Sequence, residues 1–300
     1  MRRFTREPYY SGPDDPERGQ VRGTLKLGET VVIECAGGRD GDLKPGIVPE
    51  LVKPRGSRPA GPFLIEGIKP GDWVAVEIIA LEVGPYGYYN NGGPFRGGLR
   101  SVAPVRDGMV HFPPDFVVPA RPMLGVVQLK AVGKHTQAWN HGGNMDFNSI
   151  RAGSTVHIRA QDYGGYLTIG DAHARMSDGE LTGTGVEIDA TATLRIDRSP
   201  GFPTGGPVVE TPEEILTCGT GANWPEAIKV AWTEMVGLIA DRYDTTVEHA
   251  NLIVGTIGDA VPGYAAAMLN DRGFPVAKSY VTCQIAVTKD LRRTGEPFKP

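Results

Sequence analysis

Apolar and polar residues alternate strictly along residues 186–197. Every second residue from Val186 is apolar, and the residues between them are charged or are threonines. Strict period-two alternation predicts a β-strand with one buried and one solvated face, as in antiparallel sheets. Further apolar runs at 21–35, 63–68 and 73–83 are separated by Gly, Pro and Asp turns, and they predict more strands and hairpins.

Two kinds of segment depart from this strand pattern. Residues 84–98 are rich in glycine and tyrosine and are predicted to form an aromatic loop, the kind of long loop that often carries function. Asn223 is a predicted helix N-cap, and apolar residues with helical spacing continue from it to about Asp241. Residues 246–252 and 263–269 are predicted to form shorter helices.

Strands therefore come first along the chain, and helices are confined to its last third. This order is typical of a mainly β (α+β) protein. We expect three parts: an N-terminal arm on the surface over residues 1–20, a β-rich body over 21–205 that carries any site, and an α+β part over 206–300 that packs on the body.

Composition supports this picture and excludes several classes of partner. The 41 glycines and 25 prolines are spread between apolar runs, which favours many short strands joined by tight turns. The net charge is −4 and no basic run occurs, so no nucleic-acid partner is expected. No apolar run approaches the roughly 18 residues of a membrane helix, and no apolar segment follows the N-terminal arginines as in a signal peptide. Three widely spaced cysteines fit a reducing, cytoplasmic setting.

The densest group of ionisable residues lies between two strand-like runs. Asp171 and His173 form one pair at i,i+2, and Asp178 and Glu180 form another. Residues i and i+2 of an extended chain point the same way, so each pair could converge on one ion. Carboxylate with imidazole suits zinc, whereas carboxylates alone suit calcium or magnesium. The alternative is a solvated hairpin turn at 177–179.

A second polar cluster spans His141–Asp146. Asn144 and Asp146 are again two residues apart, and they follow two glycines that permit close approach of the backbone to a ligand. The alternative is an Asx-type turn before a strand. Residues 155–169 separate the two clusters, and a β-hairpin of that length would bring them together.

Nucleophilic catalysis has less support. Cys218 precedes a predicted helix start, which could lower a thiol pKa, but no neighbouring residue supplies a base. Buried free cysteine is the commoner case. The chain has no Gly-x-Ser-x-Gly elbow and no phosphate-binding Gly-x4-Gly-Lys-Ser/Thr motif.

Taken together and in order, these segments resemble the acetamidase/formamidase family. Residues 61–72 are similar to its Gly-Pro…Val-Glu-Gly…Pro-Gly-Asp segment, and 142–146 to its Gly-Gly-Asn-Met-Asp element. Residues 170–180 resemble its Gly-Asp-x-His-Ala…Asp-Gly-Glu element, with Glu187 at the position of the glutamate that follows. The resemblance covers most of the chain.

The resemblance implies hydrolysis of short-chain amides to a carboxylate and ammonia. It implies a β-sandwich-like body with a smaller α+β part, assembly as a homodimer or larger homo-oligomer, and a divalent metal, zinc first and calcium second. The chain departs from the family at 9–15, at 85–95 and at Met176-Ser177. If these segments line the pocket, the substrate need not be formamide or acetamide.

Within that resemblance we assign hypothetical roles. The expected metal ligands are carboxylates and one imidazole: Asp146, Asp171, His173 and Asp178. The residues expected to act on the substrate are Glu180 as general base, Glu187 as the second choice of base, Asn144 as an orienting group and His141 as a donor to the oxyanion.

Two other functions stay open. The scaffold could hydrolyse another C–N bond, such as that of a cyclic amide or ureide. It could also be a non-catalytic β-sandwich module in which structural calcium occupies the acidic cluster and Tyr86, Tyr88 and Tyr89 stack on a sugar.

Overall fold

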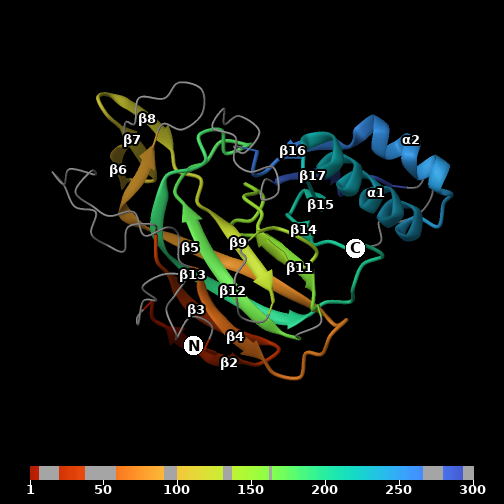
Figure 1. Ribbon diagram of the computed structural model, residues 1–300, viewed down its shortest axis with the longest axis horizontal. Helices are drawn as coiled ribbons and strands as arrows, with labels where there is room; N and C mark the ends of the chain where they lie inside the picture. The colour runs from red at the N-terminus through yellow and green to blue at the C-terminus, as the bar shows by residue number, and fades with distance from the viewer. Residues whose placement is uncertain are drawn as a thin grey trace.

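The computed structural model describes residues 1–6, 20–37, 59–90, 100–130, 137–161, 164–265 and 280–292. Within these ranges the chain forms seventeen strands and two helices (Figure 1). The strands are β1 (Arg2–Phe4), β2 (Gly23–Leu25), β3 (Glu29–Cys35), β4 (Ala60–Ile65), β5 (Trp73–Asn90), β6 (Arg100–Arg106), β7 (Met109–Phe112), β8 (Phe116–Pro119), β9 (Met123–Leu129), β10 (Gly142–Asn144), β11 (Thr155–Arg159), β12 (Tyr166–His173), β13 (Glu187–Arg198), β14 (Val208–Glu210), β15 (Glu214–Gly221), β16 (Asp259–Pro262) and β17 (Val281–Thr288). The helices are α1 (Trp224–Arg242) and α2 (Val247–Ile257).

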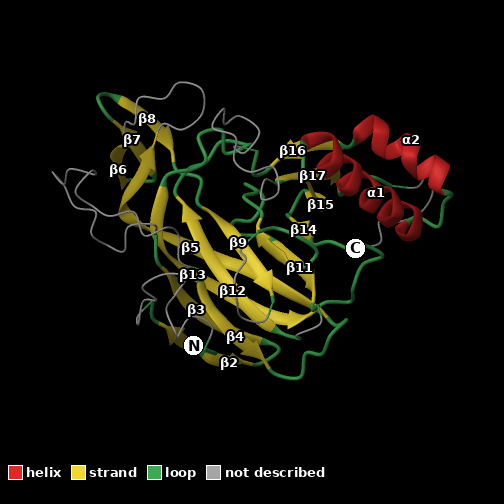
Figure 2. Cartoon of the chain, viewed as in Figure 1, coloured by secondary structure: helices red, strands yellow, loops and turns green. Residues whose placement is uncertain are grey.

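Fourteen of the strands pair into two layers, and β6, β7 and β8 form a meander that extends from the end of β5. One layer runs β1-β3-β13-β5-β11-β14-β15-β17-β16. The other runs β2-β4-β12-β9-β10. Between β12 and β13 the layers join at a single registered pair, His173 opposite Glu187. The fold is therefore mainly β with a small helical part, as predicted, and both helices lie on the side of β15–β17 (Figure 2).

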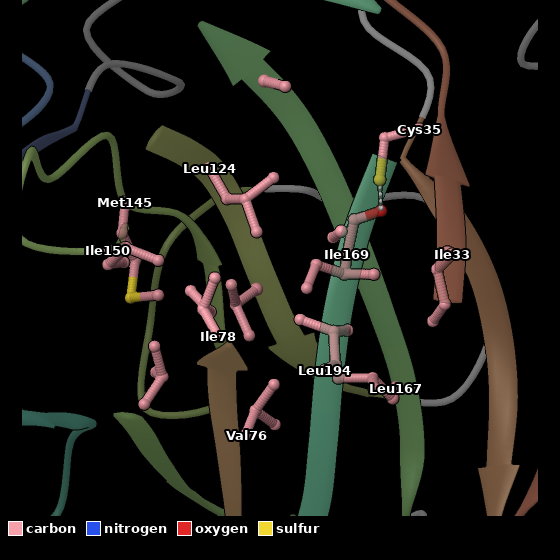
Figure 3. Close-up of a cluster of buried hydrophobic side chains, with 14 of the residues drawn as sticks. Ile33, Cys35, Val76, Ile78, Leu124, Met145, Ile150, Leu167, Ile169 and Leu194 are labelled. Atoms are coloured by element: carbon pink, nitrogen blue, oxygen red, sulfur yellow. Dashed lines mark hydrogen bonds between the residues drawn. The ribbon is translucent and has the colours of Figure 1, made fainter. Parts of the chain in front are cut away.

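The core lies between the two layers. Ile33, Ile78 and Leu194 come from the first layer, and Leu124 and Ile169 come from the second; all five are fully buried and belong to one apolar cluster (Figure 3). Full burial of such a side chain stabilises the fold by about 1.5–3 kcal/mol relative to exposure. This two-layer packing is the β-sandwich-like body that the resemblance implied.

The strongest sequence signals predicted their elements well. Along β13, buried residues at even positions alternate with partly exposed ones from Ile188 to Ile196, so the period-two prediction is confirmed. Asn223 caps α1 by accepting a hydrogen bond from the backbone N–H of Glu226 at 3.0 Å, and the helix ends one residue beyond the predicted Asp241. α2 is capped by Thr246 and is longer than predicted.

Other predictions were wrong. Residues 84–90 are not a loop: they continue β5 and pair with β6 and β13, because ladders on both edges outweigh the local preference of glycine. Gly87 is needed there, since a Cβ at this position would collide with Val186. Residues 91–99 lie outside the described ranges. Gly263–Ala265 is not helical, and the rest of the predicted helix, 266–269, lies outside the described ranges.

The predicted hairpin between the two polar clusters is also absent from the described strands. β11 pairs with β5 and β14, whereas β12 pairs with β4, β9 and β13. β9 takes the place of the hairpin, because it pairs with β10 along one edge and with β12 along the other.

Two further observations concern the ends of the chain and membranes. Residues 2–4 of the expected N-terminal arm form β1, which pairs in parallel with β3, while 7–19 lie outside the described ranges. Neither helix in the described ranges is long and apolar enough to cross a membrane. The boundaries expected at residues 20 and 205 stay a prediction.

Candidate active site

Strand β9 brings the two polar clusters together. Val126 is opposite Asn144 on β10 and opposite Gly170 on β12. Both pairings are antiparallel, so the residues that follow Asn144 and the residues that follow Gly170 both lie next to Gly125, the neighbour of Val126 on β9. A Cβ at position 125 would lie 2.7 Å from Oδ2 of Asp171 and closer still to Oδ1 of Asp146. Because Gly125 has no side chain, the two carboxylates can share the space above it.

The carboxylates belong to two groups of closely spaced metal-ligating atoms. Asp146, Asp171 and His173 form the first group, and His173, Glu180 and Glu187 form the second; within each group the ligand atoms lie within 4.8 Å of one another. His173 is common to both and is fully buried. Its Nε2 lies 2.9 Å from Oε1 of Glu187 and 4.0 Å from Oε1 of Glu180.

Backbone strain is concentrated in these residues. Asp146, Asp171 and Glu180 have φ angles of 52°, 58° and 44°, in the left-handed region that non-glycine residues rarely adopt. The other described non-glycine residues with positive φ are Asp107 and Asp244. Strained conformations persist where the surrounding structure enforces them, and they often occur at functional sites.

The turn that carries Asp146 is held by bonds from its backbone and from its neighbour. The N–H groups of Met145 and Asp146 both donate to the carbonyl of Gly125, at 2.8 and 3.2 Å. The side-chain amide of Asn144 donates to Oδ2 of Asp146. Oδ1 of Asp146 is buried and has no hydrogen-bond partner among the described residues. Buried polar atoms are normally paired, so this oxygen indicates a ligand.

The electrostatics of the site favour a bound cation. Burial and the nearby carboxylate of Asp171 raise the pKa of Asp146 well above its usual range. Burial and the charge of Asp146 raise the pKa of Glu180 in the same way. Burial lowers the pKa of His173, but Glu187, Asp171 and Glu180 outweigh it and the net pKa is well above the usual value. A divalent cation would relieve this concentration of negative charge.

The structure brings together most of the residues expected from the sequence. Asp146, Asp171, His173, Glu180 and Glu187 lie in the two groups, and Asn144 contacts Asp146.

Two expected residues lie elsewhere. Asp178 is exposed, and its carboxylate accepts a 2.7 Å hydrogen bond from Asn148, so it is outside both groups. His141 is buried on the turn before β10 and belongs to neither group among the described residues.

Sequence reasoning missed three residues. Gly125 interrupts an apolar strand, and an isolated glycine in a strand is a known sign of close approach that could have identified it. Tyr264 and Tyr280 stack with ring centroids 5.1 Å apart, and the Tyr280 hydroxyl donates to the carbonyl of Asn144 at 3.2 Å. They lie far along the chain from both clusters, and no sequence signal linked them to the site.

The fold and the site define a class: a mainly β protein with a buried carboxylate–imidazole group at the junction of two sheets. The family model of the acetamidase/formamidase family matches residues 126–286, more than half of the chain. The chain therefore belongs to the acetamidase/formamidase family, and it is an amidohydrolase that acts on short linear amides.

Solved structures with the same fold carry related names. A predicted acetamidase/formamidase from Thermoanaerobacter tengcongensis superposes with a TM-score of 0.81 at 23% identity, covering 96% of this chain and 95% of that one. Acetamidase from Yersinia enterocolitica superposes with a TM-score of 0.80 at 22% identity, covering 96% of this chain and 92% of that one. Acetamidase from Bacillus halodurans superposes with a TM-score of 0.77 at 23% identity, covering 89% of this chain and 90% of that one. At these identities the likeness concerns the fold. No curated protein sequence matches the chain significantly.

Proposed function

We propose that the chain hydrolyses a short-chain amide to a carboxylate and ammonia with a divalent metal held by Asp146, Asp171 and His173. The observation that carries this proposal is the buried Oδ1 of Asp146, which has no hydrogen-bond partner among the described residues and belongs to a residue whose group of ligand atoms lies within 4.8 Å. Two carboxylates and one imidazole are a donor set that zinc accepts readily, and calcium is the second choice.

Glu187 orients His173 in this proposal. A carboxylate accepts hydrogen bonds, so the 2.9 Å contact places a hydrogen on Nε2 of His173. The other ring nitrogen, Nδ1, has the weak thioether acceptor of Met123 at 3.1 Å. A cation that binds Nδ1 would take the place of this thioether, and a carboxylate on the opposite nitrogen is the common support for a metal-binding histidine.

Glu180 is the proposed general base. When bound, the cation supplies Lewis-acid polarisation of the amide carbonyl and lowers the pKa of water. Glu180 removes a proton from the attacking water onto a carboxylate oxygen and returns it to the departing nitrogen. Burial and neighbouring charge raise its pKa, as suits a group that must both accept and release a proton near neutral pH. Ammonia leaves poorly unless its nitrogen is protonated, so this return is required.

Hydrolysis of a panel of compounds tests the proposal, with ammonia release recorded for the linear amides and ring opening recorded by chromatography for the cyclic compounds. Formamide, acetamide and propionamide are expected to be hydrolysed, and a lactam and a cyclic ureide much more slowly. Turnover of the cyclic compounds alone would favour the alternative C–N hydrolase. Sugar binding without turnover of any amide, with a metal that changes only the melting temperature, would favour the binding module.

The assembly and location of the protein stay predictions. A homodimer or larger homo-oligomer would cover the open edges of the two layers, since unpaired strand edges are prone to association. Light scattering of the purified protein measures this state. The amide is the expected small-molecule partner, and a cytoplasmic location is expected from the cysteine content.

A further inference from the structure

Tyr264 and Tyr280 are two aromatic residues of the C-terminal part that lie against the site. Their rings are 5.1 Å apart and inclined by 34°. Thr282 fixes the backbone of Tyr264 on both sides, because its hydroxyl accepts from Tyr264 N–H at 2.6 Å and its own N–H donates to Tyr264 C=O at 2.9 Å. The backbone of Tyr264 is therefore held by Thr282, and its ring packs against the ring of Tyr280.

Hydrogen bonds connect this pair to both ligand-bearing segments. The N–H of Ala265, next to Tyr264, donates to the carbonyl of Gly179, next to Glu180, at 3.0 Å. The hydroxyl of Tyr280 donates to the carbonyl of Asn144 at 3.2 Å. The hydroxyl of Thr282 donates to the carbonyl of Met145 at 2.7 Å. The aromatic pair thus spans the gap between the Asp146 turn and the Glu180 turn.

The two tyrosine hydroxyls differ in what they contact. The hydroxyl of Tyr280 is engaged with the carbonyl of Asn144, and this side chain is partly buried against the turn. The hydroxyl of Tyr264 has no hydrogen-bond acceptor among the described residues, and Tyr264 is only partly buried. Burial and the charges of Glu180 and Asp146 raise the pKa of Tyr264, so its hydroxyl keeps its hydrogen at neutral pH. Because the residue after Tyr264 is bonded to the residue before Glu180, and its ring rests on Tyr280, this neutral phenol is a hydrogen-bond donor close to the site.

We propose that Tyr264 is a catalytic residue that donates a hydrogen bond to the carbonyl oxygen of the amide substrate. This inference rests on the proposed hydrolysis and assigns to Tyr264 the donor role that the sequence suggested for His141. Attack by water converts the carbonyl oxygen into an oxyanion, and the hydrogen bond strengthens as that charge grows. The phenolic hydrogen stays on Tyr264 throughout, so the step transfers no proton and needs no further reactant.

The substitution Tyr264→Phe tests the role by removing one hydroxyl and leaving the ring stack. We expect kcat for acetamide to fall by about 100- to 1,000-fold, the usual effect of losing one oxyanion donor. KM is expected to stay within about threefold, because the bond is strongest in the transition state. Metal content and melting temperature are expected to match the wild type.

The matched control is Tyr243→Phe, which also removes a tyrosine hydroxyl from the C-terminal part; the hydroxyl of Tyr243 donates to the carbonyl of Leu291, away from the site. Its kcat is expected to equal that of the wild type. A phosphonamidate that mimics the tetrahedral intermediate should bind Tyr264→Phe more weakly by about the same factor as kcat/KM falls, while the affinity for acetate barely changes.

Three results would overturn the inference. The first is a wild-type kcat in Tyr264→Phe, and the second is a change in KM alone. The third is a loss of activity that only follows a loss of metal or a lower melting temperature, which would show a structural role. A failure of the proposed function can be told apart from these three results, because in that case the wild type itself would release no ammonia from any linear amide. Where the wild type is active, a fully active Tyr264→Phe refutes the role of Tyr264 alone.

Discussion

Replacing Asp146 by Asn is expected to abolish amide hydrolysis while leaving the fold intact. Asn has nearly the same shape and tolerates the left-handed backbone at this position, where φ is 52°. The substitution removes one of the two carboxylate ligands, and the loss of metal-based stabilisation of about 4 kcal/mol lowers kcat/KM by about a thousandfold. Ammonia release and bound-metal analysis on the same sample measure both effects.

The same variant is expected to be more stable than the wild type in the absence of metal. The pKa of Asp146 is raised in the folded state by burial and by Asp171. Such a carboxyl group contributes stability that is lost as the pH rises through its folded pKa, starting from about pH 4. Asn does not titrate, so the difference in melting temperature should grow with pH. A metal-free Asp146→Asn protein that melts below the wild type at neutral pH would contradict this account.

Asp178→Asn is the matched control for Asp146→Asn. Both substitutions exchange a carboxylate for an amide within the family-like segments, but Asp178 is exposed and bonded to Asn148. Its activity and metal content are expected to stay within about twofold of the wild type. Loss of metal from Asp178→Asn would restore Asp178 to the ligand set predicted from the sequence.

Replacing Gly125 by Ala is expected to disable the site through a single methyl group. The new Cβ would lie 2.7 Å from Oδ2 of Asp171 and closer to Oδ1 of Asp146, so both carboxylates must move. The two carboxylates are the ends of side chains, whereas the backbone carbonyl of Asp171, 3.1 Å from the new Cβ, must shift by only a few tenths of an ångström, which the fold can absorb. A displacement of about 1 Å at the reacting centre costs about a hundredfold in rate. We therefore expect a folded Gly125→Ala protein with weakened metal binding and kcat at least about 100-fold lower.

Gly84→Ala is the matched control for Gly125→Ala. Gly84 also lies in a long central strand, but the nearest atom to a Cβ there is the carbonyl of Asp189 at 3.5 Å, an ordinary contact. This variant is expected to keep both metal and activity. A Gly125→Ala protein with unchanged metal affinity would show that the space above Gly125 is not where the cation binds.

Local patterns predicted the elements whose stability depends on local residues. The alternation along β13 and the Asn223 cap of α1 each depend on positions close in sequence, and both were predicted correctly. The loop prediction for residues 84–90 was wrong because β6 and β13 hold this segment as a strand, and both strands lie far from it in sequence. Glycine and proline marked a break in the pattern, but pairing on both edges overrode them.

The two polar clusters were predicted correctly as neighbours, but for the wrong reason. A hairpin was expected to bring them together, whereas β9 does so by pairing on both edges. Register between distant strands is not encoded in the clusters themselves. For the same reason, nothing near Tyr264 indicated that Ala265, the next residue, would bond to Gly179 beside Glu180.

The spacing argument for paired ligands was only partly valid. It assumed an extended chain, but Glu180 has a φ of 44°, and this turn buries Glu180 while Asp178 stays exposed. The strained backbone that separates the pair cannot be inferred from residue spacing. It reflects tertiary constraints, which is common where a site needs a special geometry.

The central claim is that a divalent cation on Asp146, Asp171 and His173 is required for amide hydrolysis. The most direct test is to strip the protein with a chelator, confirm by elemental analysis that no metal remains, and titrate zinc back while ammonia release from acetamide is recorded. The account predicts no activity without metal and full recovery at about one equivalent per chain, with no recovery for Asp146→Asn. Undiminished activity in the metal-free protein would contradict it.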